Sequence, residues 1–130
     1  MGGGGVFGGV KKKIQVLSVK ILPEASQLID NAFYYAETNF GEIAVQRWEK
    51  ELSRIMDRIR FFPKSYERVH ILKSIYKQEF RSAVIRRNFR IVFLINESHN
   101  EIIIVDLWDL RMPEENRLRQ IERVIRRNRL

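Results

Sequence analysis

Charged and apolar side chains alternate between Ile75 and Val84, and this pattern predicts a β-strand with one charged face. Lys77, Glu79 and Arg81 occupy every second position of the stretch. Because successive side chains of a strand point to opposite sides, these three would share one face and could all reach a single phosphate group. The simpler alternative is a solvated outer face that carries only ion pairs, because exposed pairs are common and stabilise little.

Two further strands are predicted to follow, which would make residues 75–111 an antiparallel meander. Residues 86–88 interrupt the first strand, and residues 89–95 are β-branched and aromatic, as strands prefer. A polar turn over residues 96–100 then leads to an apolar strand over residues 101–110. The rest of the chain would pack on this sheet or add charge around it.

The region before the meander predicts one strand and a pair of helices. Residues 14–22 are a strand candidate, and Pro23 follows at a position where a helix can begin. Apolar residues then recur at helical spacing up to Gly41, a residue that favours a helix end. A second helix with a straight apolar seam spans about residues 42–61 and ends at Pro63. The loop between the helices is short, so they must be antiparallel neighbours.

The segments on either side of the meander are basic. Residues 64–74 are interpreted as a polar connection into the sheet. After Pro113, two acidic residues favour the start of an Arg-rich helix. Its apolar stripe is narrow, which predicts a helix that is stable only when it is docked.

The predicted order of elements is β-α-α-β-β-β-α. We expect an α+β fold in which a helical hairpin packs on one face of a mostly antiparallel four-stranded sheet and leaves the other face partly open. Residues 1–13 are expected to be a disordered leader rich in Gly and Lys, and residues 14–130 a single domain.

The distribution of charge points to a polyanionic partner. The chain of 130 residues has a formal net charge of +8. Residues 64–90 carry eight Lys and Arg against two Asp and Glu, and residues 111–130 carry seven Arg against three Glu. This asymmetry predicts binding to nucleic acid or to an acidic protein, and a basic surface without a partner is the alternative.

The composition also excludes several classes of protein. The chain has no cysteine, so it has neither a disulfide framework nor a thiolate metal site. No apolar run approaches the roughly 20 residues of a membrane span, and the N-terminus lacks the apolar core of a signal peptide. We therefore expect a soluble cytoplasmic protein with no membrane partner.

Several segments have an order and spacing that occur together in one family. They are VKILPEA at residues 19–25, RFFP at 60–63, YK and FRS at 76–82, FRIVF at 89–93 and VDLWDLR at 105–111. With this order the chain resembles the RelE/ParE family of toxins, the growth-arresting halves of bacterial type II toxin–antitoxin pairs. The resemblance covers roughly residues 14–120.

The resemblance implies a toxin that a small acidic antitoxin holds silent. RelE-like members are metal-independent ribonucleases that cut mRNA, usually on the ribosome, whereas ParE-like members inhibit DNA gyrase and are not known as nucleases. An mRNA-cleaving toxin that acts on RNA at the ribosome without a cofactor or metal is the first expectation. A non-enzymatic inhibitor of gyrase and a non-toxic nucleic-acid-binding relative are the alternatives.

The resemblance also implies which residues would act in a ribonuclease. Such cleavage needs a base for the 2′-hydroxyl, cations for the phosphorane charge and an acid for the leaving oxygen. Arg81, Arg90 and Arg111 would stabilise the phosphate and the transition state, and Lys77 or Glu79 would be the base. Arg81→Ala would then abolish growth arrest and leave the fold intact. The residues expected to bind nucleic acid are Lys73, Arg86, Arg87 and Arg117.

Other features favour a protein that acts by binding. Glu79 stands where several ribonuclease members carry a second Lys, and nothing aromatic follows Trp108 to serve as the acid. Trp108 is more often a core residue than a base-stacking one on an apolar strand. His70 and His99 fit surface positions better than catalytic ones, because no predicted strand places them beside the charged trio. A Mg²⁺ site built from acids at 106, 109, 114 and 115 is the least favoured alternative.

Overall fold

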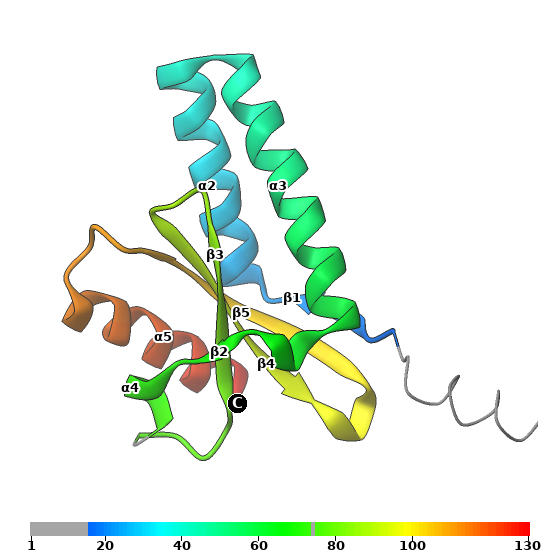
Figure 1. The fold of residues 1–130 in the computed structure, drawn as a ribbon. Helices are drawn as coiled ribbons and strands as arrows, with labels where there is room; N and C mark the ends of the chain where they lie inside the picture. The colour runs from blue at the N-terminus through cyan, green and yellow to red at the C-terminus, as the bar shows by residue number, and fades with distance from the viewer. Residues whose placement is uncertain (1–15, 74) are drawn as a thin grey trace, which may run out of the picture.

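A five-stranded sheet lies between two layers of helices in the computed structural model, which describes residues 16–73 and 75–130 (Figure 1). The expected leader at residues 1–13 and the first two residues of the expected strand lie outside the described residues. In chain order the elements are β1 (Ser18–Ile21), α2 (Pro23–Phe40), α3 (Glu42–Phe61), η1 (Pro63–Ser65), β2 (Glu67–Arg68), α4 (His70–Lys73), β3 (Phe80–Ile85), β4 (Phe89–Asn96), η2 (Glu97–His99), β5 (Glu101–Asp109) and α5 (Glu114–Asn128).

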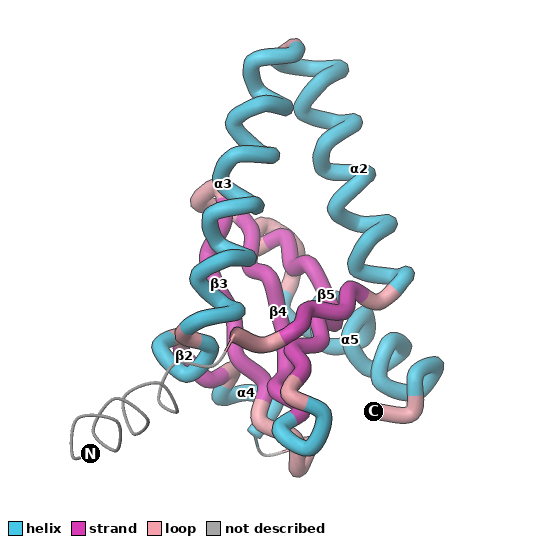
Figure 2. Tube along the Cα trace, turned by 90° about the vertical axis from the view of Figure 1, so that its right-hand side faces the viewer, coloured by secondary structure: helices cyan, strands magenta, loops and turns pink. Residues whose placement is uncertain are grey.

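The helical hairpin forms where the sequence predicts it. Pro23 is the first residue of α2, where its missing N–H costs no hydrogen bond. Gly41 joins the two helices with φ of +86°, a conformation that other residues rarely adopt. Helix α3 ends at Phe61, and Pro63 then begins the short η1 turn. Both helices stand on the same face of the sheet (Figure 2).

The strands follow the order β1-β5-β4-β3-β2. Strand β1 is parallel to β5 and the other pairs are antiparallel, so the expectation of a mostly antiparallel sheet is confirmed. The expected number of four strands is wrong, because the two-residue strand β2 pairs with β3 inside the segment predicted to be a connection. The same segment contains the short helix α4, whose four residues are too few for a periodic pattern.

The sheet is buried on both faces. One core joins α2 and α3 to residues such as Ile91, Phe93 and Ile104, and the other joins α4 and α5 to residues such as Val92, Leu94 and Trp108. The expectation that one face of the sheet is partly open is therefore wrong. Its cover is the Arg-rich helix α5, which buries Ile121, Val124 and Ile125 against the sheet and so forms a docked helix, as its narrow stripe predicts.

The first strand of the meander starts later than predicted. Strand β3 begins at Phe80, so Tyr76, Lys77 and Glu79 lie in the preceding loop. Tyr76 nevertheless packs beside Phe80, with ring centroids 6.0 Å apart. Tyr76 is therefore an apolar residue that packs on the core from a loop. The alternation of apolar and charged residues before Phe80 comes from this loop and not from a strand.

Candidate functional site

A groove lies between the helical hairpin and the end of β5 nearest Arg111. Its volume is about 980 Å³, and it reaches across α2, α3, β4 and β5. At its base Trp48 of α3 packs edge-on against Phe89 of β4, with centroids 5.1 Å apart. Because this aromatic pair joins the hairpin to the sheet, the groove has a rigid floor.

The wall of the groove carries apolar side chains that are open to water. Tyr35 and Phe40 of α2 are 56% and 71% exposed, and Ile43 of α3 is 65% exposed. The rings of Tyr35 and Phe40 lie 6.3 Å apart in an edge-on contact. A contiguous apolar surface of this kind, bordered by polar groups, is typical of a surface that binds another protein.

Three arginines border the same groove. Arg111 donates to both carboxylate oxygens of Asp109 at 3.0 Å, and its guanidinium lies 5.6 Å from the centre of the Phe89 ring. These hydrogen bonds hold the pKa of Asp109 below its usual value and raise that of Arg111. Arg47 makes no ion pair with any residue that the structure describes.

Arg86 lies in the tight turn between β3 and β4. Its φ of 49° and that of Arg87, 63°, are unusual for residues other than glycine. Glu51 of α3 accepts a hydrogen bond from the backbone N–H of Arg86 at 2.8 Å and pairs with its guanidinium at 3.5 Å. This carboxylate fastens the turn to the hairpin and so fixes Arg86 at the border of the groove.

The structure separates the predicted catalytic residues. Arg81 pairs across the sheet with Phe93 and faces the hairpin, whereas Arg90 pairs with Trp108 and faces α5. Arg90 donates to Ser82 Oγ at 3.0 Å on that second face. Arg111 is at the groove. The three arginines thus point to different parts of the molecule and do not surround one phosphate.

Lys77, Glu79 and Arg81, which the sequence predicted on one face of a strand, do not share such a face. Arg81 is only 8% exposed, and it donates to the carbonyl oxygens of Lys64 at 3.3 Å and Tyr66 at 2.6 Å. It also pairs with Glu79 at 2.8 Å, and Glu79 pairs with Arg68 at 2.6 Å. The expected common face is wrong because Glu79 precedes the strand and Arg81 is buried under η1.

The contacts of Arg81 predict a loss of stability in Arg81→Ala, contrary to the intact fold expected from the sequence. Truncation leaves the carbonyl oxygens of Lys64 and Tyr66 without this donor and removes one of the two arginine partners of Glu79, which should lower the free energy of unfolding by about 2 to 4 kcal/mol. Urea unfolding followed by circular dichroism measures this change. Lys77→Ala, which removes an exposed loop cation, is the control and should change it by less than about 0.5 kcal/mol. Equal midpoints for the two variants would show that Arg81 is not structural.

Lys77 and Glu79 do come together, with Lys73 of α4 and Arg68 of β2, around a small hollow of about 250 Å³. Burial raises the pKa of Glu79, but the hydrogen bond from Arg81 and the neighbouring cations outweigh burial and lower it overall. A lower pKa makes this carboxylate a weaker general base. The hollow therefore keeps a cluster of cations but a poor base.

The four residues predicted to bind nucleic acid lie on different elements. Lys73 ends α4, and Arg86 and Arg87 form the β3–β4 turn. Arg117 donates to the carbonyl of Met112 at 2.7 Å and lies 5.7 Å from the Trp108 ring, so it holds the start of α5 against the sheet. The four do not form one patch.

Other sequence interpretations can be compared with the structure directly. Trp108 is 5% exposed, which confirms that it is a core residue. His70 and His99 are exposed, as surface residues are. Among residues 16–73 and 75–130, no group of three or more Asp, Glu or His is placed to hold a metal ion. No helix in this part of the chain is long and apolar enough to cross a membrane.

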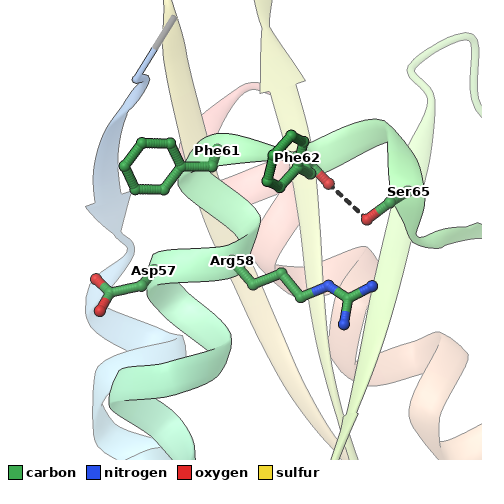
Figure 3. A pocket seen from close by; sticks show the side chains of 5 residues that line it. All are labelled: Asp57, Arg58, Phe61, Phe62 and Ser65. Atoms are coloured by element: carbon green, nitrogen blue, oxygen red, sulfur yellow. Dashed lines mark hydrogen bonds between the residues drawn. The ribbon is translucent and has the colours of Figure 1, made fainter. Parts of the chain in front are cut away.

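A second hollow, of about 480 Å³, lies where α3 ends (Figure 3). Phe61 and Phe62 line it, and Ser65 Oγ donates to the carbonyl oxygen of Phe62 at 2.7 Å. Asp57 and Arg58 point away from each other in Figure 3. The hollow thus gathers no set of side chains that could do acid–base chemistry together.

Asp106 is a buried carboxylate that sequence reasoning did not single out as a structural group. A register shift between Val92 and Phe93 turns it toward α5. Its Oδ2 accepts from Trp108 Nε1 at 2.8 Å, and its Oδ1 accepts from Gln120 Nε2 at 2.8 Å and the Leu107 N–H at 3.0 Å. Burial raises the pKa of Asp106 to about 7, although these donors act in the opposite direction.

The aromatic wall of the groove was also missed. Leu28, Ala32 and Ala36 of the apolar stripe predicted for α2 also line the groove, but Tyr35 and Phe40 were not counted in that stripe and were left unexplained. Aromatic residues that extend the apolar stripe of an amphipathic helix beyond what the core needs are a signal that could have indicated a binding surface.

The fold and the groove together define a basic α+β domain with an exposed, partly apolar groove. The family model described as "ParE toxin of type II toxin-antitoxin system, parDE" matches residues 19–113, and the chain belongs to this family. The resemblance seen in the sequence is thereby confirmed, and the protein is a type II toxin. A comparison with curated proteins finds no match.

Proposed function

We propose that this toxin acts by binding its target, with DNA gyrase as the target, and does not cleave RNA. The observation that supports this most is the burial of Arg81, whose guanidinium already binds two carbonyl oxygens and Glu79. A ribonuclease of this kind needs cations free to meet a phosphorane, and Arg81 is not free. The separation of Arg90 from Arg111 supports the same proposal.

We further propose that the groove is the binding site of the antitoxin. Its exposed apolar wall suits the apolar side of a partner segment, and its bordering arginines suit acidic side chains on that segment. Among the three arginines considered for catalysis, Arg111 lines the groove and could meet the antitoxin there, whereas Arg81 is buried and Arg90 lies on the other face. Affinity for the antitoxin should fall as salt concentration rises.

A ribonuclease remains the second candidate, because Lys73, Lys77 and Arg68 gather at one hollow beside Glu79. This cluster could bind a phosphate in an RNA chain. The low pKa of Glu79 and its two ion pairs weigh against it as the base of a cleavage reaction.

Induction of the toxin alone in a bacterium separates these functions. The gyrase proposal predicts filamentous cells and a DNA-damage response, with transcripts whose 5′ ends do not change within minutes. Early translation arrest with new 5′ ends inside coding sequences would instead support the ribonuclease. Normal growth would contradict both. Co-expression of the cognate antitoxin is the control, and it should restore growth.

A further inference from the structure

The outward face of α5 carries a row of exposed arginines. We call these four residues the α5 stripe: Arg119, Arg123, Arg126 and Arg127. At 3.6 residues per turn they lie on the side of the helix opposite Ile121, Val124 and Ile125, which are buried against the sheet. The docking of α5 by its apolar side therefore fixes the arginines toward solvent.

Little negative charge balances the stripe. Arg123 makes no ion pair with any described residue, and Arg119 donates to the neutral amide of Asn116. Arg126 pairs with Glu122 within the helix, and Arg127 reaches Glu24 only at 3.7 Å. The exposed Arg126–Glu122 pair and the long Arg127–Glu24 contact are weak enough for a polyanion to replace them.

The surroundings of the stripe suit phosphate better than a protein surface. Ten large apolar residues of the described chain are well exposed, and none of them lies on α5. A protein interface needs an apolar centre, whereas contacts to a phosphate backbone do not. The cations of residues 111–130 are all arginine. The planar guanidinium group of arginine can donate two parallel hydrogen bonds to a phosphate.

The same features distinguish between kinds of nucleic acid. Single strands are held largely by stacking on aromatic side chains, and α5 has none. The deep, narrow major groove of duplex RNA does not admit a helix, whereas that of B-DNA is about 12 Å wide. We propose that the α5 stripe binds the phosphate backbone of duplex DNA without reading its base sequence, a function separate from that of the groove.

Fluorescence anisotropy of the purified full-length toxin with a labelled 20-base-pair DNA duplex tests this. Four phosphate contacts predict that log K falls with log salt with a slope of about −3 to −4. The variant R119Q/R123Q/R126Q should bind at least about 10-fold more weakly at 0.1 M salt, with a slope shallower by about 2 to 3. Glutamine keeps a good helix propensity, so α5 should persist, and circular dichroism checks this.

The matched control is K20Q/K50Q/R54Q, which removes the same charge from exposed positions on β1 and α3. It should change the affinity by less than about 2-fold and leave the slope unchanged. Equal losses in both triple variants would overturn the proposal, because net charge alone would then explain binding. Absence of wild-type binding at 0.05 M salt would also overturn it. So would equal or tighter binding of polyglutamate, single-stranded RNA or duplex RNA.

Discussion

Truncation of Tyr35 to alanine is expected to weaken the binding of the antitoxin by about 30-fold or more. Tyr35 is 56% exposed in the free toxin and lines the groove beside Phe40 and Arg111. A tyrosine that becomes desolvated at the centre of an interface commonly contributes about 2 kcal/mol, which corresponds to that loss of affinity. Isothermal titration calorimetry with the purified cognate antitoxin measures the effect.

The neighbouring residue Tyr34 supplies a matched control. It is 73% exposed on the same helix and does not line the groove. Tyr34→Ala should therefore change the affinity by less than about 3-fold, and both variants should unfold like the wild type because neither ring is buried. If both variants lost affinity to the same extent, the groove would not be the binding site of the antitoxin. The toxicity of the induced protein could still follow the gyrase proposal, so the two tests are independent.

The second large effect is on stability: Asp106→Asn should become more stable relative to the wild type as the pH rises. Burial raises the folded pKa of Asp106 from 3.8 to about 7, so the folded state holds this proton more tightly than the unfolded chain. Wild-type stability should therefore decline as pH rises from about 4 and should level off just above pH 7. The full difference corresponds to a loss on the order of 4 kcal/mol. Asparagine has no charge to bury and escapes this loss.

The quantity to measure is the free energy of unfolding of the variant minus that of the wild type, in urea, at several pH values. This difference should rise by a few kcal/mol between pH 4 and pH 8, whatever its value at pH 4, where asparagine loses one of the three hydrogen bonds. Asp30→Asn, which alters an exposed carboxylate, should give a difference that stays within about 0.5 kcal/mol. A flat difference for Asp106→Asn would mean that the carboxylate is not buried in a way that resists ionisation.

Hydrogen bonds explain how the buried Asp106 is accommodated at the interface between α5 and the sheet. Gln120 reaches from α5 to the carboxylate, and Trp108 donates from the same strand. A buried polar network of this kind is stabilising only when every member has its partner. The sequence shows an acidic residue within an apolar strand, but the partner on α5 is 14 residues away and cannot be inferred from strand periodicity.

The elements themselves were largely predictable, because their signals are local. Pro23, Gly41 and Pro63 mark the ends of the two long helices, and apolar periodicity supplies their buried sides. The β-branched runs predicted β4 and β5 for a similar reason. The start of β3 was misplaced because Tyr76 packs on Phe80 from a loop and imitates the alternation of a strand.

The candidate site could not be predicted in the same way. Alternation along the chain placed Lys77, Glu79 and Arg81 together, but whether a cation is free depends on groups that come from elsewhere in the fold. Arg81 is enclosed by carbonyl oxygens of residues 64 and 66, and Arg90 lies on the opposite face of the sheet.

The amino-acid sequence by itself determined the family, the α+β class, the helical hairpin and the concentration of positive charge in the second half of the chain, because each depends on local pattern or composition. Only the tertiary structure decided that α5 closes the second face of the sheet, that Arg81 is buried and that the groove gathers Tyr35, Phe40 and Arg111. Those outcomes depend on contacts between residues far apart in the chain, and burial determines whether a charged side chain can meet a ligand.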